Sequence, residues 1–238
     1  SKIINMFKYA FEAIVIISGI LLSFYIEELR IESKNIELKN EILVELKYTA
    51  EDDLKQINFI ESLLLEVLKS VEILLEDIEN KHNNLTDREV IENLIKIEYA
   101  ISFIPKDGIY SELISTGSFE LIENRKLKSV LLEVYNHLKE RNLTISKILD
   151  EQIQNYHSGY REEFKLTIDH IKTKENELYG GFIIDGFEFN LNYYLSGKLI
   201  GELTTAEYSS GNYLNLLDTI KKSYHQLIVL LDEELVKI

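Results

Sequence analysis

The stretch FEAIVIISGILLSFYIEELR, residues 11–30, decides the fold at the amino-terminal end of this chain. From Tyr9 to Ile26 the residues are apolar, small or aromatic, and Glu12 is the only charge. A helix over this run rises about 27 Å, close to the ~30 Å hydrocarbon core of a bilayer. Tyr9 and Tyr25 stand near its two ends, where aromatic rings favour the membrane interface. The pattern predicts a transmembrane helix; the alternative is a helix buried in a protein core.

The flanks of the run predict how it is anchored. No small-residue cleavage site follows, because the sequence continues as FYIEELR, so we expect an uncleaved anchor. Basic residues lie on both sides, with more of them after the run than before it: Lys2 and Lys8, then Arg30, Lys34, Lys39 and Lys47. The count favours a single pass with a cytoplasmic carboxyl-terminal domain, and a periplasmic domain is the alternative.

One stripe of this helix carries both of its charges. Its members are spaced by 4, 3, 4, 3 and 4 residues: Glu12, Ile16, Gly19, Ser23, Ile26 and Arg30. The small side chains of Gly19 and Ser23 permit close helix packing, and a charge in lipid costs several kcal/mol unless it faces protein or water. We therefore expect these residues to line a pore or to pack the helices of a homo-oligomer. The alternative is that Glu12 lies at the interface and pairs with Lys8.

The remaining chain favours helices throughout. The sequence contains one proline and ten glycines, and 45% of its residues are hydrophobic. Helix formers continue past Ile26, with Leu29, Ile36 and Leu43 at seven-residue spacing. We expect a mainly α fold: a transmembrane segment at 1–26, a helical stalk at 27–50 and a soluble helical bundle or sensor domain at 51–238, with one helix reaching Tyr48 and a second following it.

Capping and turn residues predict further elements. Asp87 is expected to cap one helix, and Gly117 to end another before Asn124 caps a long helix toward Tyr160. At most one small β-hairpin is expected, at 182–189 across Asp185-Gly186. Near the carboxyl end, apolar and aromatic residues at spacings of 4 and 3 mark a core or oligomer-facing helix: Tyr213, Leu217, Ile220, Tyr224, Leu227 and Leu231.

Composition argues against several kinds of chemistry. The formal net charge is −15, with 41 acidic against 26 basic residues, which disfavours duplex nucleic acid as a partner. The chain has no cysteine, and its five histidines lack metal-ligand spacing. Thr116-Gly117-Ser118 lacks the lysine of a phosphate-binding loop. We expect neither an enzyme, nor a metal site, nor a cofactor.

Basic residues near one helix start form the strongest candidate ligand site. They could hold phosphates with help from amide groups at the helix amino terminus: Arg125, Lys126, Lys128, Lys139 and Arg141. Oligomerisation would multiply this patch around an axis. The alternative is that these side chains are solvated and paired with nearby glutamates.

Two motifs carry a resemblance to known proteins. An E-x₆-G-I-L-L pattern starts at Glu12, and Y-x-x-L-x-S-T-G-S-x-x-L-I-x-N-x-x-L spans 110–127. Together with the charged stalk, they resemble a family of bacterial single-span proteins classed as a domain of unknown function. The resemblance covers the first 50 residues and 110–135, and matches at Leu113, Gly117, Leu121, Ile122, Asn124 and Leu127. The chain departs from that family after the span, where FYIEELR replaces an asparagine and a tryptophan.

The architecture is also similar to membrane effectors of bacterial anti-phage defence systems, such as the Hailong effector, a channel gated by DNA oligomers. This similarity implies a homo-oligomeric pore in lipid, controlled by a nucleotide or a single-stranded oligonucleotide. The alternative function is a non-conducting, membrane-tethered interaction or scaffold protein.

Overall fold

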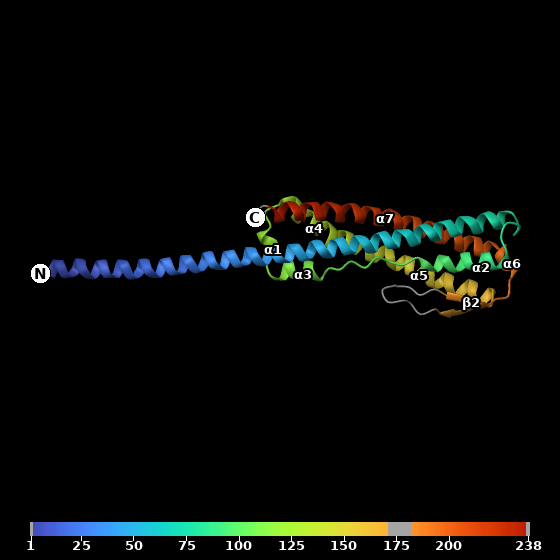
Figure 1. Cartoon of the computed structure of the whole chain (residues 1–238), viewed down its shortest axis with the longest axis horizontal. Helices are drawn as coiled ribbons and strands as arrows, with labels where there is room; N and C mark the ends of the chain where they lie inside the picture. Colours follow the sequence, from blue (N-terminus) through green and yellow to red (C-terminus); the bar gives the residue numbers. More distant parts are fainter. Residues whose placement is uncertain (1, 171–181, 237–238) are drawn as a thin grey trace. The chain divides into compact units, whose positions relative to one another are not determined.

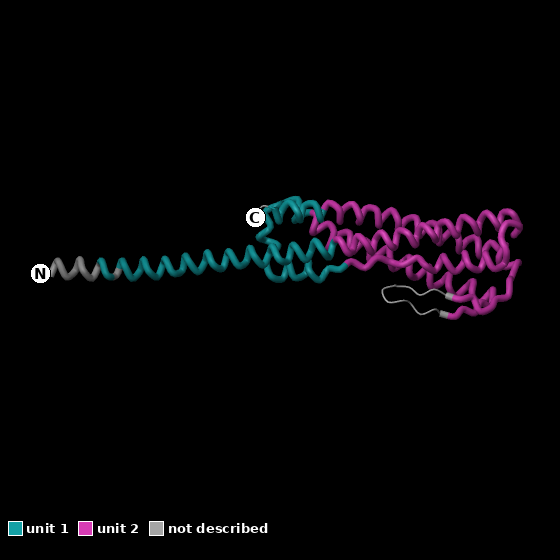
Figure 2. The backbone as a smooth tube through the Cα atoms, in the orientation of Figure 1, with its two compact units in different colours: residues 1–50, 106–129, 227–238 teal, residues 51–105, 130–226 magenta. Residues whose placement is uncertain are grey.

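The computed structural model describes the backbone of residues 2–170 and 182–236, and the side chains of 11–12, 14–169 and 183–236. Helices make up 83% of the structure, and one small antiparallel sheet accompanies them, so the predicted mainly α fold is confirmed (Figure 1). The chain divides into two compact units: unit 1 holds 1–50, 106–129 and 227–238, and unit 2 holds 51–105 and 130–226 (Figure 2).

The first helix, α1 (Lys2–Glu79), is unbroken. The sequence predicted two helices here, with a boundary after Tyr48, and that boundary is wrong. Residues 27–79 contain neither glycine nor proline, so nothing interrupts the helix. At the predicted boundary the Thr49 hydroxyl donates to the Glu45 carbonyl at 2.9 Å, and Ala50 is buried. The helix ends before Lys81 and His82, which have positive φ values of 56° and 60°.

Unit 1 packs the last turns of its α1 segment against short elements from the middle and the end of the chain. These elements are α3 (Gly108–Ser115), η2 (Ser118–Leu121), the start of α4 (Arg125–Leu132) and the end of α7 (Gly197–Leu235). Its core consists of apolar side chains from α1, α3, α4 and α7 and of Ile122, which follows η2: Ile42, Leu43, Leu46, Tyr110, Leu113, Ile122, Leu127, Leu227, Leu230 and Leu231. A buried ion pair joins Lys39 to Glu234 at 3.5 Å.

Two predicted local signals in unit 1 are confirmed. Gly117 adopts φ +76° directly after α3, a conformation that glycine adopts without strain. The Asn124 side chain accepts hydrogen bonds from the backbone N–H groups of Lys126 and Leu127, at 3.0 and 3.2 Å, and so caps α4.

Unit 2 is a bundle built around α5 (Lys139–Glu163) and the greater part of α7. A π-helical turn, η3 (Glu133–Leu138), joins α4 to α5. The bundle also contains α2 (Asp87–Lys96), η1 (Ile97–Tyr99), α6 (Leu191–Tyr194) and the α1 segment after residue 50. The residues of the α7 stripe in this unit, Tyr213, Leu217, Ile220 and Tyr224, are all buried, and Leu227 and Leu231 are buried in unit 1, so the stripe belongs to the core.

The start of α2 corrects one prediction. Thr86, not Asp87, is the capping residue: its side chain accepts from the Glu89 N–H, and the Glu89 carboxylate accepts from the Thr86 N–H at 2.8 Å. Asp87 is the first helical residue, and its carboxylate lies 2.9 Å from His82 Nε2 instead.

The sheet shows that the predicted hairpin turn is also wrong. β2 (Phe182–Gly186) lies inside the predicted 182–189 segment, but its partner is β1 (Thr167–His170), paired in antiparallel fashion. Asp185-Gly186 therefore does not form the hairpin turn, because Gly186 pairs with Thr167 in the ladder. The segment that joins the two strands lies outside the described residues.

Candidate ligand groove and exposed helix

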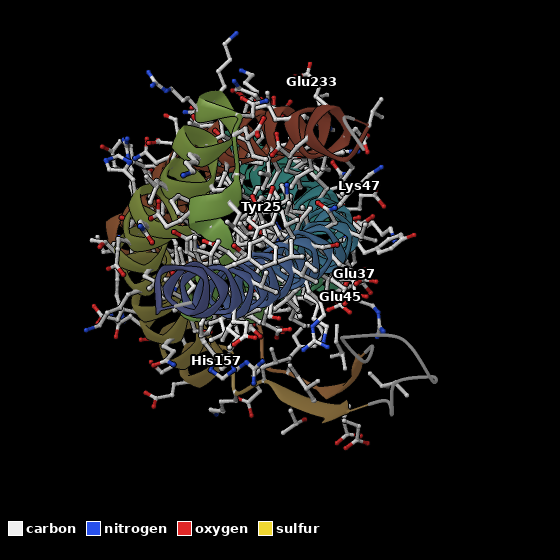
Figure 3. All side chains as sticks on the ribbon, turned by 90° about the vertical axis from the view of Figure 1, so that its left-hand side faces the viewer. Tyr25, Glu37, Glu45, Lys47, His157 and Glu233 are labelled. Carbon is white, nitrogen blue, oxygen red and sulfur yellow. The ribbon has the colours of Figure 1, made fainter. Side chains whose placement is uncertain are left out.

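The amino-terminal part of α1 has no cover from the described chain. Every described side chain from Phe11 to Leu38 is exposed, and Lys39 is the first buried one. Fifteen of these side chains are large and apolar, with exposed fractions of 37–69%: Phe11, Ile14, Val15, Ile16, Ile17, Ile20, Leu21, Leu22, Phe24, Tyr25, Ile26, Leu29, Ile31, Ile36 and Leu38. Figure 3 draws the side chains on the ribbon, with Tyr25 and Glu37 labelled.

The predicted membrane span begins at Tyr9, whose side chain lies outside the described residues. Among the side chains that the structure does describe, no helix offers an apolar stretch of the length needed to cross a bilayer.

The predicted stripe from Glu12 to Arg30 is exposed along its whole length. The Ser23 hydroxyl donates to the Gly19 carbonyl at 2.9 Å, so its hydrogen-bonding need is met within its own helix. A Cβ atom added at Gly19 would meet nothing within 4 Å. Arg30 pairs with Glu27 at 2.8 Å. Whether the stripe lines a pore or packs against a second copy stays a prediction.

The five predicted phosphate-binding residues do not share one environment. Arg125 and Lys126 are exposed in the first turn of α4 in unit 1. Lys128, in the same unit, bonds to the Glu120 carbonyl at 3.2 Å and lies 5.3 Å from the centre of the Phe119 ring. Lys139 and Arg141 belong to α5 in unit 2. Lys128 is therefore already engaged, and of the five only Arg141 lines either of the two cavities described next.

The cavity beside Arg141 measures about 470 Å³ and lies between α5 and α7; we call it the Arg141 cavity. Its polar wall consists of Gln152, Tyr208, Ser209, Asn212, Asn215 and Thr219, and its apolar wall of Ile145, Ile148, Leu149 and Leu216. None of the described residues that line it carries a carboxylate, although the chain has 41 acidic residues. An anion in this cavity would meet the exposed guanidinium of Arg141 and neutral side-chain donors.

A second cavity, of about 440 Å³, lies along the same two helices and shares Leu149, Gln152 and Ser209 with the first; we call it the Gly201 cavity. Its walls are mostly apolar and include Ile97, Ala100, Ile153, Tyr156 and Ala206. Its α7 wall consists largely of small residues, such as Gly201, Ala206 and Ser210. A Cβ atom added at Gly201 would meet nothing within 4 Å.

Several polar groups around the Gly201 cavity already have partners in the described chain. The Tyr156 hydroxyl donates to the Leu94 carbonyl at 3.0 Å, and burial raises the pKa of this phenol well above its ordinary value, so it stays neutral. The Ser209 hydroxyl bonds to Gln152 and to the Thr205 carbonyl. The cavity interior therefore offers mainly apolar surface.

The rim of the Gly201 cavity carries one charge of each sign. The Glu202 carboxylate accepts from the Tyr193 hydroxyl at 2.8 Å. Lys198 Nζ lies 5.3 Å from the centre of the Tyr193 ring, one helical turn before Glu202. Because these charges offset each other, the net positive end of the two cavities is the one at Arg141.

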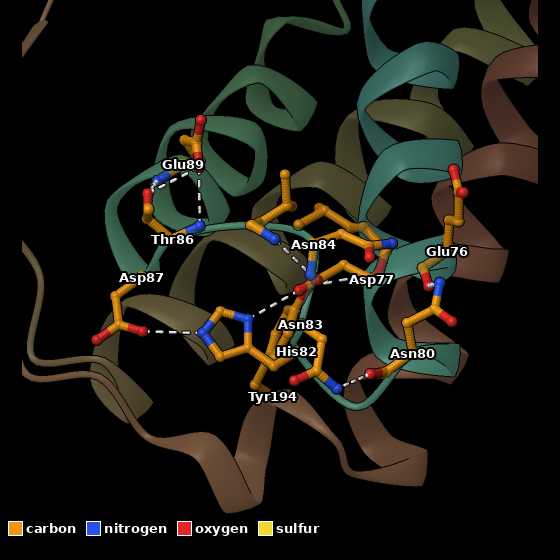
Figure 4. A network of polar contacts seen from close by, with 12 residues as sticks. Glu76, Asp77, Asn80, His82, Asn83, Asn84, Thr86, Asp87, Glu89 and Tyr194 are labelled. Carbon is orange, nitrogen blue, oxygen red and sulfur yellow. Dashed lines mark hydrogen bonds and ion pairs between the residues drawn. The ribbon is translucent and has the colours of Figure 1, made fainter.

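A polar network at the end of α1 resembles a site but is structural (Figure 4). His82 Nδ1 lies 2.8 Å from the Asp77 carboxylate, and Nε2 lies 2.9 Å from Asp87. Asp77 also accepts from the Tyr194 hydroxyl at 2.7 Å and from the N–H groups of Asn84 and Leu85. Both ring nitrogens are occupied by carboxylates, so neither is available to a substrate. Within the described residues, no group of three metal-ligating side chains could hold a metal ion.

No protein family, curated protein or solved structure matches the chain. The resemblance to bacterial single-span proteins and to anti-phage effectors therefore stays a prediction.

Proposed function

We propose that the chain is a homo-oligomeric, single-span membrane protein whose amino-terminal helices form a ligand-controlled pore. The exposed apolar part of α1 is the observation that carries this proposal. A helix that is apolar on all sides is stable only inside lipid or protein, and eleven large apolar side chains from Phe11 to Ile26 have no cover from the described chain. The proposed span runs from Tyr9 to Ile26; its described part, from Phe11, accounts for about 24 Å of helix.

Glu12 and the stripe behind it support an assembly rather than a single helix. Its charge is far less costly when it faces protein or water than when it faces lipid. In a ring of copies, Glu12 would form an acidic constriction that favours cations. Gly19 and Ser23 would let the helices approach closely, because the Ser23 hydroxyl already bonds to its own helix.

The stalk supports the same assembly. Leu43 is fully buried in unit 1, whereas Leu29 and Ile36, two heptads and one heptad earlier, are 47% and 41% exposed. The seam that packs the core at Leu43 thus continues along α1 without a covering element. Apolar residues at seven-residue spacing are typical of helices that pack against a second helix, and a second copy of α1 supplies one.

Control by a ligand is supported by the Arg141 cavity, which suits an anion. A ligand changes the pore only if it binds the open and closed states with different affinity. A nucleotide or a single-stranded oligonucleotide is the anion that the resemblance implies. We place the protein in a bacterial inner membrane, with residues 27–238 on the cytoplasmic side, as the membrane effector of an anti-phage system.

Conductance of the purified protein in lipid bilayers tests this proposal. We expect cation-selective current that depends on the added nucleotide or oligonucleotide. Glu12→Gln should lower cation selectivity, whereas the matched control Glu28→Gln, off the stripe, should leave it unchanged. Absence of current with every ligand would refute the pore. If replacing residues 9–26 with an unrelated apolar helix preserved the cellular effect, the chain would be a membrane-tethered scaffold instead.

A further inference from the structure

We propose that the Arg141 and Gly201 cavities together form one binding site for a small amphiphilic anion. Its acidic group pairs with Arg141, and its apolar body lies in the Gly201 cavity. The two cavities share three wall residues, Leu149, Gln152 and Ser209, so one ligand can extend from one to the other between α5 and α7.

The Gly201 cavity has the size of a ligand pocket. It is a groove open to solvent at Lys198, Gly201 and Thr205, which are exposed, and its volume of about 440 Å³ lies within the range of ligand pockets, roughly 300–1,000 Å³. That volume equals about 15 water molecules at liquid density. Water gains little there, because the walls are mostly apolar and the described polar groups of Tyr156 and Ser209 already have partners. An apolar body fits the cavity better than water does.

The charges orient the ligand. Arg141 offers a planar fork of donors that suits a carboxylate or a phosphate, and Asn212 and Asn215 add neutral amides beside it. At the other end of the site, the Glu202 carboxylate would repel the acidic group of the ligand. Lys198, one turn away on the same helix, offsets the charge of Glu202, so this end carries no net positive charge. A single acidic group therefore belongs at Arg141. Fatty carboxylates and alkyl phosphates share this chemistry.

The inferred ligand, an amphiphilic anion, takes the place of the nucleotide that the resemblance implies for this site, and it rests on the proposed function only for the consequence that binding controls a pore. Binding itself is measured without conductance, so either can fail without the other.

A single cysteine tests the site, because the chain has none of its own. Gly201→Cys places a thiol in the cavity wall, where a Cβ atom meets nothing within 4 Å. The rate of its alkylation by N-ethylmaleimide is measured in the full chain with dodecanoate, dodecyl phosphate or adenosine monophosphate, below micelle-forming concentrations. Ala206→Cys, on the same wall, is a second reporter, and Thr204→Cys, on α7 but outside the wall, is the control. Melting temperatures of all variants are recorded alongside.

We expect at least one of the two dodecyl anions to slow alkylation of the Gly201→Cys and Ala206→Cys variants about tenfold, and to leave the rate of the Thr204→Cys variant unchanged. Which of the two anions protects better separates a fatty acid from a phosphate ester as the source. Adding Arg141→Gln should raise the concentration for half-protection about tenfold, whereas Lys147→Gln, an exposed cation on the same helix, should not change it.

Three results would contradict the proposal. Protection by adenosine monophosphate alone would overturn the apolar body of the ligand. Equal protection with and without the Arg141 guanidinium would overturn the acidic contact. No protection by any of the three compounds would overturn the site.

Discussion

The hydroxyl of Tyr213 should be worth several kcal/mol to unit 2, because it closes a buried ring of hydrogen bonds. It accepts from the Phe103 N–H at 2.7 Å and donates to Asn142 Oδ1 at 2.9 Å. The Asn142 amide in turn donates to the Phe103 carbonyl at 2.8 Å. All three residues are at most 2% exposed. Burial raises the pKa of Tyr213, so the phenol remains protonated and can donate across the ordinary pH range.

Tyr213→Phe removes this hydroxyl and leaves two buried groups without partners: the Phe103 N–H and one lone pair of Asn142 Oδ1. Each such group costs about 1–3 kcal/mol. We expect the free energy of unfolding to fall by about 3 kcal/mol. This is less than the upper limit for two unpaired groups, because small shifts of neighbouring side chains can satisfy part of their hydrogen bonding. For a unit of this size the melting temperature should fall by roughly 6–12 °C.

Urea denaturation followed by circular dichroism, with the protein in detergent, measures the change. Tyr208→Phe is the matched control, because Tyr208 is 73% exposed and should change the free energy by less than about 0.5 kcal/mol. The double variant Tyr213→Phe/Asn142→Leu should lose about 1–2 kcal/mol less stability than the sum of the losses of the two single variants, because both substitutions break the same ring of hydrogen bonds. A Tyr213→Phe protein as stable as the Tyr208→Phe control would refute the reasoning.

Three further predictions concern other contacts. Lys39→Met removes the cation that pairs with the buried Glu234 carboxylate and should destabilise unit 1 by about 3–5 kcal/mol. Combining Lys39→Met with Glu234→Leu should recover most of this loss in the same urea denaturation assay. Gly117→Ala should cost about 1 kcal/mol, because φ +76° is strained for alanine, and Gly117→Asn should cost less. Burial lowers the pKa of His82, but the hydrogen bonds to Asp77 and Asp87 outweigh burial and raise the pKa above 6.5. The stability that His82 contributes is therefore complete below pH 6.5 and is lost as the pH rises through the raised pKa. The difference in melting temperature between the wild type and His82→Gln should shrink between pH 6 and pH 9.

Local sequence signals predicted the helices of this fold well, because each acts over a few residues. Gly117 and Asn124 end and start helices as expected, and the stripe from Tyr213 to Leu231 is buried. Two of the wrong predictions depended on competition between neighbours. Thr86 caps α2 because Glu89 completes its capping box, which leaves Asp87 for His82. Gly186 pairs with Thr167, a partner that local turn preference could not identify.

The candidate site was predicted only in part, because a cavity is a missing volume that no single residue signals. Charge alone predicts both Arg141 and Lys128 as phosphate-binding residues. Only the packed structure shows that Lys128 pairs with Glu120, whereas Arg141 lines a cavity whose wall residues carry no carboxylate. One signal was present in the sequence. Continued toward the amino end at spacings of 3 and 4, the α7 stripe passes from tyrosine and leucine to Ser210, Ser209 and Ala206. Small residues in core register indicate either close helix packing or an open space.

The Gly201→Leu variant tests whether the Gly201 cavity binds a ligand or only reflects imperfect packing between α5 and α7. Leucine at this exposed helical position improves helix propensity by roughly 0.6–1 kcal/mol relative to glycine, and its side chain would cover part of the mostly apolar groove that Gly201 lines. Together we expect a gain of about 1–2 kcal/mol in the stability of unit 2. A gain of this size would mean that the native glycine leaves available stability unused, as proteins do where function needs an opening.

In the Ala206→Cys background, Gly201→Leu should raise the melting temperature and abolish protection of the introduced thiol by dodecyl anions. Gly201→Ala is the matched control: it should raise the melting temperature less and keep the protection, because a methyl group leaves most of the cavity open. A Gly201→Leu variant that is more stable and still protected would show that the ligand does not use this cavity.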